Sequence, residues 1–193
     1  MKELLRALLM QTIARPADAA RTLVGLNLPR EAGWMALFLA TIINTFAYFA
    51  THAIVVLPDD FWVPVFNVPI IYLTLSFSFS TMAIFGVYWT GQTLGGKAHF
   101  PVLVSMLAWL VCVQSLADFV FLGLLMIVPT LAGLFSLAAG LYGIWIFLNF
   151  VKVAHGFTTM GKAILTITLT LVGLIVGLSV FLSVIGITAM GIS

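Results

Sequence analysis

The sequence predicts an all-α, polytopic membrane protein with five transmembrane helices and one or two amphipathic helices at a cytoplasmic N-terminus. Of the 193 residues, 63% are hydrophobic and 7% are charged, and the mean hydropathy is +1.22. An ordinary soluble domain is about a quarter charged. Several apolar runs are long enough to cross the roughly 30 Å hydrocarbon core of a bilayer. The alternating apolar and polar segments of an outer-membrane barrel do not occur in the sequence, so the predicted spans are helices.

The first segment, residues 1–31, is expected to be cytoplasmic and amphipathic. Its apolar side chains recur at helical spacing and are Leu4, Leu5, Leu8, Leu9 and Ile13. Pro16 ends this helix and can begin a second one. We expect Arg15 and Arg21 to lie near anionic lipid headgroups, and a frayed terminus is the alternative. The pattern differs from a cleaved signal peptide, because Arg6 interrupts the apolar stretch.

The second segment, residues 32–193, is the predicted membrane domain. Its five expected spans are 34–57, 63–89, 101–127, 131–151 and 163–190. Residues 101–151 contain one charged residue, Asp118. A single helix of that length would extend about 75 Å, so this region must fold back once. Pro129 is the expected break, although the boundary between the third and fourth spans stays open.

The distribution of lysine and arginine predicts the orientation. With the N-terminus in the cytoplasm, the cytoplasmic segments are 1–32, 91–100 and 152–162, and they hold all eight basic residues. The opposite side receives Asp59 and Asp60. Cytoplasmic loops carry an excess of Lys and Arg. The sequence therefore predicts a cytoplasmic N-terminus and a C-terminus on the other side.

Three polar residues inside the expected spans, His52, Gln114 and Asp118, are candidates for a functional site. An ionisable group within a span is costly and usually faces protein or water. Gln114 lies one helical turn before Asp118, and His52 and Asp118 fall at similar depths in their spans. One interpretation pairs Asp118 with His52 in a polar pocket or proton path. The other places Asp118 at the outer interface, solvated or hydrogen-bonded to a neighbouring helix, and its depth favours this second interpretation.

No enzyme, cofactor or metal site is predicted. The sequence lacks an HExxH or GxSxG motif and a phosphate loop. Cys112 is the single cysteine, so neither an internal disulfide nor a thiolate cluster can form. Gly173 and Gly177 are spaced four residues apart in the fifth span, which offers a face for close helix packing. This face is expected to serve contact within the chain, with contact between chains as the alternative.

The last cytoplasmic loop, His155 to Lys162, is expected to be a short ordered turn. Gly156 can take the left-handed conformation that closes the fourth span. Thr158 or Thr159 can cap the fifth span.

This loop and the one before the third span are expected to form a joint surface. Lys97 and His99 come from one loop, and His155 and Lys162 come from the other. If all four lie on one face, they form a compact basic patch suited to anionic lipid headgroups or to an acidic partner segment.

Two local patterns carry a resemblance to a known family. Gly95-Gly96 precedes the third span, and Trp145 in the fourth span is followed by His155-Gly156-Phe157-Thr158 and Lys162-Ala163-Ile164. With five spans, an amphipathic N-terminus and almost no C-terminal tail, the chain resembles bacterial members of the Yip family. Many relatives place a proline inside the third span where Gln114 stands here, which leaves the bend of that span open.

The resemblance implies a non-enzymatic scaffold or adaptor in the bacterial inner membrane, acting through its cytoplasmic face. Its partners would be membrane lipids and another membrane protein or a second copy of the chain, with no nucleic acid and no cofactor. Binding of Rab-type GTPases does not carry over, because the N-terminal region has only about 30 residues. The alternative function is a small-solute, proton or lipid pathway that uses Asp118, His52 and Gln114.

Overall fold

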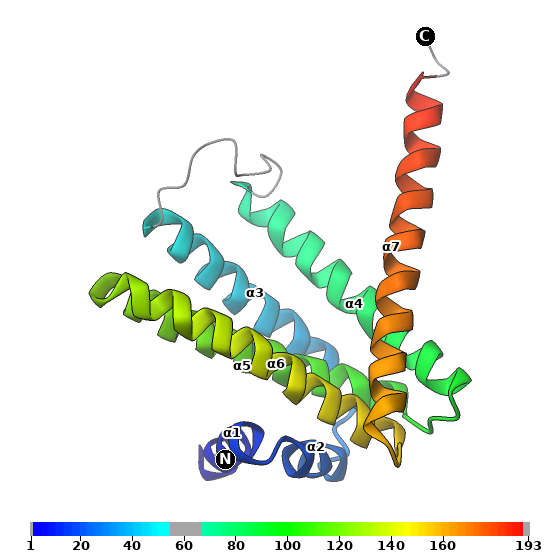
Figure 1. Cartoon of the computed structure of the whole chain (residues 1–193), viewed down its shortest axis with the longest axis horizontal. Coiled ribbons are helices and arrows are strands. Elements are labelled where there is room, and N and C mark those ends of the chain that lie inside the picture. Colours follow the sequence, from blue (N-terminus) through cyan, green and yellow to red (C-terminus); the bar gives the residue numbers. More distant parts are fainter. Residues whose placement is uncertain (1, 55–66, 191–193) are drawn as a thin grey trace.

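The computed structural model describes residues 2–54 and 67–190, and in these ranges the chain is all-helical (Figure 1). The helices are α1 (Lys2–Ala14), α2 (Pro16–Gly25), α3 (Arg30–Ile54), α4 (Pro69–Thr93), α5 (Phe100–Ile127), α6 (Pro129–His155) and α7 (Met160–Met190). Five of them, α3 to α7, are long and apolar enough to cross a membrane. The predicted all-α architecture with five membrane-spanning helices is therefore confirmed.

The helix bounds differ from the expected spans at several ends. Helix α3 begins at Arg30, four residues before the expected start, and its expected end at residue 57 lies outside the described residues. The expected start of the second span near residue 63 lies outside the described residues; helix α4 begins at Pro69, after Val68 with an extended backbone. Helices α5 and α6 meet at Val128, and Pro129 begins α6, where a missing N–H costs no helical hydrogen bond.

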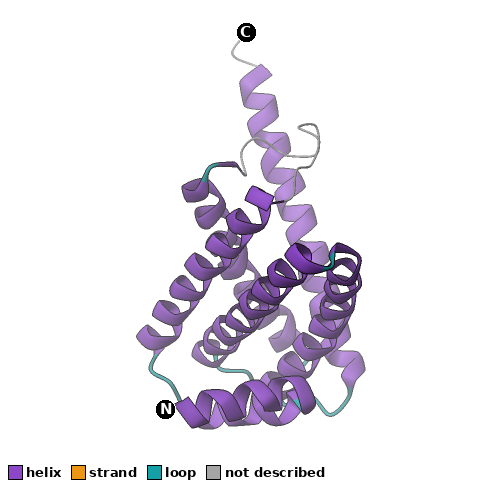
Figure 2. Ribbon diagram, turned by 90° about the vertical axis from the view of Figure 1, so that its left-hand side faces the viewer, coloured by secondary structure: helices purple, strands orange, loops and turns teal. Residues whose placement is uncertain are grey.

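Helices α1 and α2 pack against the membrane helices and form no frayed tail. Figure 2 shows them running across one end of the bundle. Leu8 of α1 and Ala19 and Ala20 of α2 are buried in one apolar cluster with Ile146 and Phe150 of α6. Such burial stabilises the docked position in proportion to the apolar area removed from solvent.

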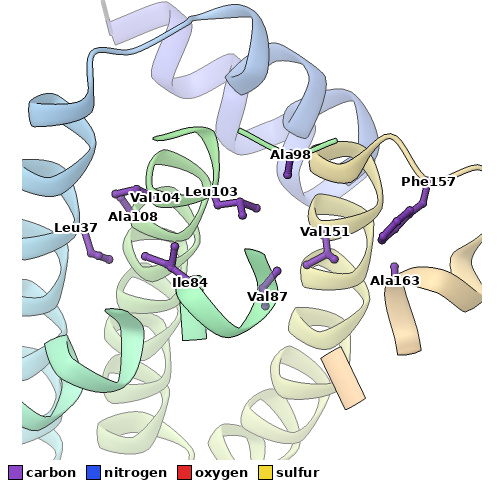
Figure 3. Packing of buried hydrophobic residues seen from close by; sticks show 10 residues of the cluster. All are labelled: Leu37, Ile84, Val87, Ala98, Leu103, Val104, Ala108, Val151, Phe157 and Ala163. Atoms are coloured by element: carbon purple, nitrogen blue, oxygen red, sulfur yellow. The ribbon is translucent and has the colours of Figure 1, made fainter. Parts of the chain in front are cut away.

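The largest buried cluster lies where the α4–α5 and α6–α7 loops approach each other (Figure 3). It joins Leu37 of α3, Val104 of α5 and Val151 of α6, and its loop-side members are Ala98 and Phe157. The two loops are thus anchored by apolar packing.

Helix α7 contacts the bundle along its first half and then leaves it, as Figure 1 shows. Thr90 of α4 shares a 2.8 Å hydrogen bond between hydroxyl groups with Thr170 of α7, and it donates to the Thr166 carbonyl at 3.3 Å. Further along α7, a Cβ added at Gly173 or Gly177 would meet no atom within 4 Å. The expectation that these two glycines pack closely within the chain is therefore wrong, because α7 has already diverged where they occur.

Charge pairs contribute little to this fold. Within residues 2–54 and 67–190 the only ion pair joins Arg21 and Asp18, 2.5 Å apart on the exposed side of α2. An exposed pair of this kind typically contributes 1 kcal/mol or less. Packing and hydrogen bonds hold the described helices together.

Candidate functional site

The candidate site is one end of the bundle, made by loops 94–99 and 156–159 together with α1 and α2. We call it the basic end, because every Lys and Arg of the chain lies in these elements or in the helix turns that adjoin them. The two loops are joined directly: the backbone N–H of Lys97 donates to the His155 carbonyl at 3.0 Å. This bond fixes the α4–α5 loop against the end of α6.

His155 fills the space between the two loops. Its side chain is 1% exposed, its Nδ1 atom lies 3.0 Å from the Val151 carbonyl oxygen, and its ring stacks on Phe157 with the centroids 5.1 Å apart. The ring lies directly against Gly91 and Gly96. A Cβ at Gly96 would come within 2.5 Å of the ring and 2.7 Å of the Gly91 carbonyl oxygen. Only glycine fits at these two positions without displacing the ring.

Gly156 makes the turn that follows. Its φ of +66° and ψ of +28° are left-handed, as predicted, and glycine takes this conformation at no steric cost. The next N–H, of Phe157, returns to the Lys152 carbonyl at 2.9 Å and satisfies the last turn of α6. Thr159 directly precedes α7, but neither Thr158 nor Thr159 makes a side-chain hydrogen bond in the described part of the chain. The predicted threonine cap is therefore wrong.

Three members of the predicted basic patch lie exposed at the basic end, namely Lys97, His99 and Lys162. Lys162 Nζ donates to the Leu94 carbonyl at 3.2 Å and lies 5.8 Å from the centroid of the Phe157 ring. Lys162 therefore ties the start of α7 to the neighbouring loop as well as carrying charge.

His155 is the exception in this set. The expectation that His155 belongs to the surface patch is wrong, because its ring is buried. It supports the loops that carry the exposed residues. The spacing of residues alone could not predict that His155 is almost fully buried while His99 is exposed.

The predicted headgroup-facing arginines, Arg15 and Arg21, are both exposed. Arg15 stands between α1 and α2, and its carbonyl accepts the N–H groups of Asp18 and Ala19 at 2.9 and 3.2 Å. Arg21 is held by its ion pair with Asp18. Their helices are fixed to α5 and α6, so both charges are presented from a defined position.

The intramembrane polar residues form a separate cluster between α3 and α5. Asn44 of α3 donates to Oδ2 of Asp118 at 3.0 Å, and Gln114 donates to Oδ1 at 2.9 Å. The partner that α3 supplies to Asp118 is thus Asn44. His52 lies two turns further along α3, where its ring packs on Tyr48 with the centroids 4.1 Å apart. The observed arrangement is a hydrogen bond between neighbouring helices, which was the second interpretation of Asp118.

This arrangement predicts a small effect for Asp118→Asn. An asparagine keeps one acceptor for Asn44, and a rotated Gln114 amide can accept from the new NH₂ group. Because hydrogen bonds between membrane helices contribute about 0.6 kcal/mol each, we expect the free energy of unfolding to fall by less than about 1 kcal/mol.

Equilibrium unfolding in mixed detergent–SDS micelles measures this difference. Asp118→Leu, which removes both bonds, is the matched control and should be more destabilising. If Asp118→Asn lowered the free energy of unfolding as much as Asp118→Leu, the hydrogen bonds would not explain the role of Asp118, and its charge would matter.

The side chains that fix α1 were not predicted from the sequence. Trp109 of α5 donates its indole N–H to the Thr12 hydroxyl at 2.9 Å. Tyr142 of α6 donates its hydroxyl to the Ile13 carbonyl at 2.5 Å. Thr12 is 0% exposed, so this contact is buried between α1 and α5.

Among the described residues, no group of three or more His, Cys, Asp or Glu side chains could hold a metal ion. What the basic end presents is a preformed cationic surface supported by buried packing. Such a surface is suited to binding anionic groups.

One comparison with known proteins gives a match. The family model described as the Yip1 domain matches residues 10–181, which is most of the chain. No curated protein and no solved structure matches the chain.

Proposed function

The chain belongs to the Yip1 domain family, and from that membership we propose that it is a non-enzymatic scaffold or adaptor that binds partners through the basic end. The observation that carries the proposal is the construction of this end. Lys97 and His99 are exposed on the α4–α5 loop, Lys162 is exposed in the first turn of α7, and His155 packs between the two loops. Binding surfaces held rigidly in advance lose less entropy on association.

We further propose that the protein lies in a bacterial inner membrane with the basic end in the cytoplasm. The excess of basic residues at this end supports that orientation. The partners that fit are membrane lipids with anionic headgroups and an acidic segment of another membrane protein or of a second copy. The charged side chains at this surface are mostly cationic, so attraction to an anionic partner is expected to depend on salt.

The double substitution Lys97→Gln and Lys162→Gln tests the proposal. Each basic residue near an anionic surface contributes about 1 kcal/mol. The double variant is therefore expected to bind anionic liposomes or a purified acidic partner segment about 30-fold more weakly, as measured by flotation or by titration in nanodiscs.

Two controls separate binding from structure. Lys97→Gln alone retains the Lys162 hydrogen bond to Leu94 and should give about half of the free-energy loss. Labelling of a cysteine at residue 95 in a Cys112→Ser background should report the same side of the membrane in wild type and variant. Unchanged binding in the double variant would leave these lysines with a topological role and would contradict the proposal.

A proton or solute pathway is the second candidate, because Asp118 is an ionisable group within the spans that accepts hydrogen bonds from two side-chain amides. The Asp118→Asn variant discriminates between the two. An intact fold with loss of a transport phenotype would favour the pathway, whereas an unchanged phenotype would favour the adaptor.

A further inference from the structure

A large apolar cavity lies between α4, α5, α6 and α7, with α1 along one side. Its volume is about 1220 Å³, larger than the roughly 300–1000 Å³ of sites for drug-sized ligands. It has 26 lining residues, and those with polar side chains are Ser80, Gln114 and Tyr142. Because packed protein leaves few gaps larger than a water molecule, a space of this size between membrane helices is filled by a molecule from its surroundings.

Two features of the sequence create the space. Helix α6 presents small residues to the cavity, including Ala139, Gly140 and Gly143, and a Cβ at either glycine would meet nothing within 4 Å. On the other side α7 has left the bundle. The lining residues Leu171 and Ile175 of α7 are 54% and 65% exposed, so the cavity is open on that side. In a bilayer this opening faces hydrocarbon.

Helix α1 joins the cavity to positive charge. Leu9 and Ile13 line the cavity, and Lys2 and Arg6 precede them on the same helical face, because the spacing 2, 6, 9, 13 alternates four and three residues. Lys2 and Arg6 are exposed. Over residues 2–54 and 67–190, neither takes part in an ion pair. One stripe of α1 therefore has an apolar half at the cavity and a cationic half beside it.

From this combination we propose that the cavity is a binding site for an anionic phospholipid. The acyl chains fill the space between α5, α6 and α7, and the phosphate group lies against Lys2 and Arg6. The apolar lining selects the chains, the lateral opening admits them from the bilayer, and the two basic residues select the headgroup. Lys2 and Arg6 also lie at the basic end, but this site does not involve Lys97 or Lys162, so its test is independent of the test of the adaptor function.

The test measures which lipids the purified protein retains. We expect native mass spectrometry in mild detergent to detect phosphatidylglycerol bound to the wild type, with an affinity about 30-fold higher than that for phosphatidylethanolamine, or about fivefold for each basic residue. Gly143→Phe, which places a benzyl group among the lining residues of α6 and narrows the cavity, should weaken retention of both lipids. The matched control is Leu141→Phe, because Leu141 is 64% exposed on α6 outside the cavity lining and should leave retention unchanged.

A second variant keeps the test decisive if Gly143→Phe folds poorly. Lys2→Gln with Arg6→Gln changes only exposed residues, and it should abolish the preference for phosphatidylglycerol while chain binding remains. Equal retention in wild type and Gly143→Phe would overturn the proposal, as would an unchanged headgroup preference in the double variant. A wild type that purifies as a lipid-free dimer, with Gly143→Phe monomeric, would instead assign the cavity to a second copy of the chain and would also overturn it.

Discussion

Gly91→Ala is expected to lower the free energy of unfolding by about 2 kcal/mol, although alanine is the better helix former. In the interior of an ordinary helix this replacement stabilises by about 1 kcal/mol. Here the three atoms nearest to the new Cβ all belong to the buried His155 ring, and the closest approach is a severe overlap. Overpacking of a filled interior costs about 1–3 kcal/mol, occasionally more. The ring cannot move away without losing its hydrogen bond to Val151.

A double-mutant cycle identifies the cause. In a His155→Ala background the obstacle is gone, so Gly91→Ala should change sign and stabilise the protein by the ordinary helical preference. Gly161→Ala, where a Cβ meets nothing within 4 Å, is the matched control and should not destabilise. Unfolding in mixed detergent–SDS micelles gives the four free energies of the cycle. If Gly91→Ala were equally destabilising with and without His155, the overlap between the new Cβ and the His155 ring would not be the cause of the destabilisation.

Ala20→Leu is expected to detach α1 and α2 from the membrane helices. Ala20 is 0% exposed against the α5 and α6 side chains, and three added carbons have no room there. The cost of about 1–3 kcal/mol acts on a docked element that can separate while the spans stay inserted. The expected result is rapid tryptic cleavage after Arg21 in intact vesicles whose outer surface carries the basic end, at least tenfold faster than in the wild type.

Ala14→Leu provides the comparison for this experiment. Ala14 ends α1 and is exposed, so the same added volume should leave the cleavage rate unchanged. Protection of Arg21 in both variants would mean that the small residues of α2 are not what holds it in place.

Composition and the spacing of apolar runs were sufficient to predict five helical spans, because burial in lipid demands long apolar helices and little else. The high apolar content of the helices also makes their tertiary contacts hard to predict. When almost every side chain is apolar, periodicity cannot tell a face that packs on protein from one that meets lipid. Gly173 and Gly177 illustrate the ambiguity, since their spacing fits close packing and yet α7 is open there.

The basic end could be predicted in outline and not in its interior. The distribution of charge predicted that Lys97, His99 and Lys162 lie at one end of the bundle. The position of Gly156 after the last turn of the fourth span predicted its left-handed conformation. The burial of His155 could not be predicted, because it depends on Gly96 and Gly91, which lie 59 and 64 residues earlier in the chain. Asp118 was equally ambiguous: its one-turn spacing indicated Gln114, whereas its partner on α3 depends on a helix register that only the fold supplies.

The exposed ion pair between Arg21 and Asp18 is the only one in the described part of the chain, and this has a practical consequence. Raising the ionic strength from 0.1 to 1 M shortens the Debye length from about 10 Å to about 3 Å, which weakens attraction between exposed charges and leaves apolar packing and buried hydrogen bonds in place. Across the part of the chain that the structure describes, the fold has almost no ionic contact to lose. Concentrated salt is therefore a selective reagent for this protein, able to release an anion held at its surface while the helices stay assembled.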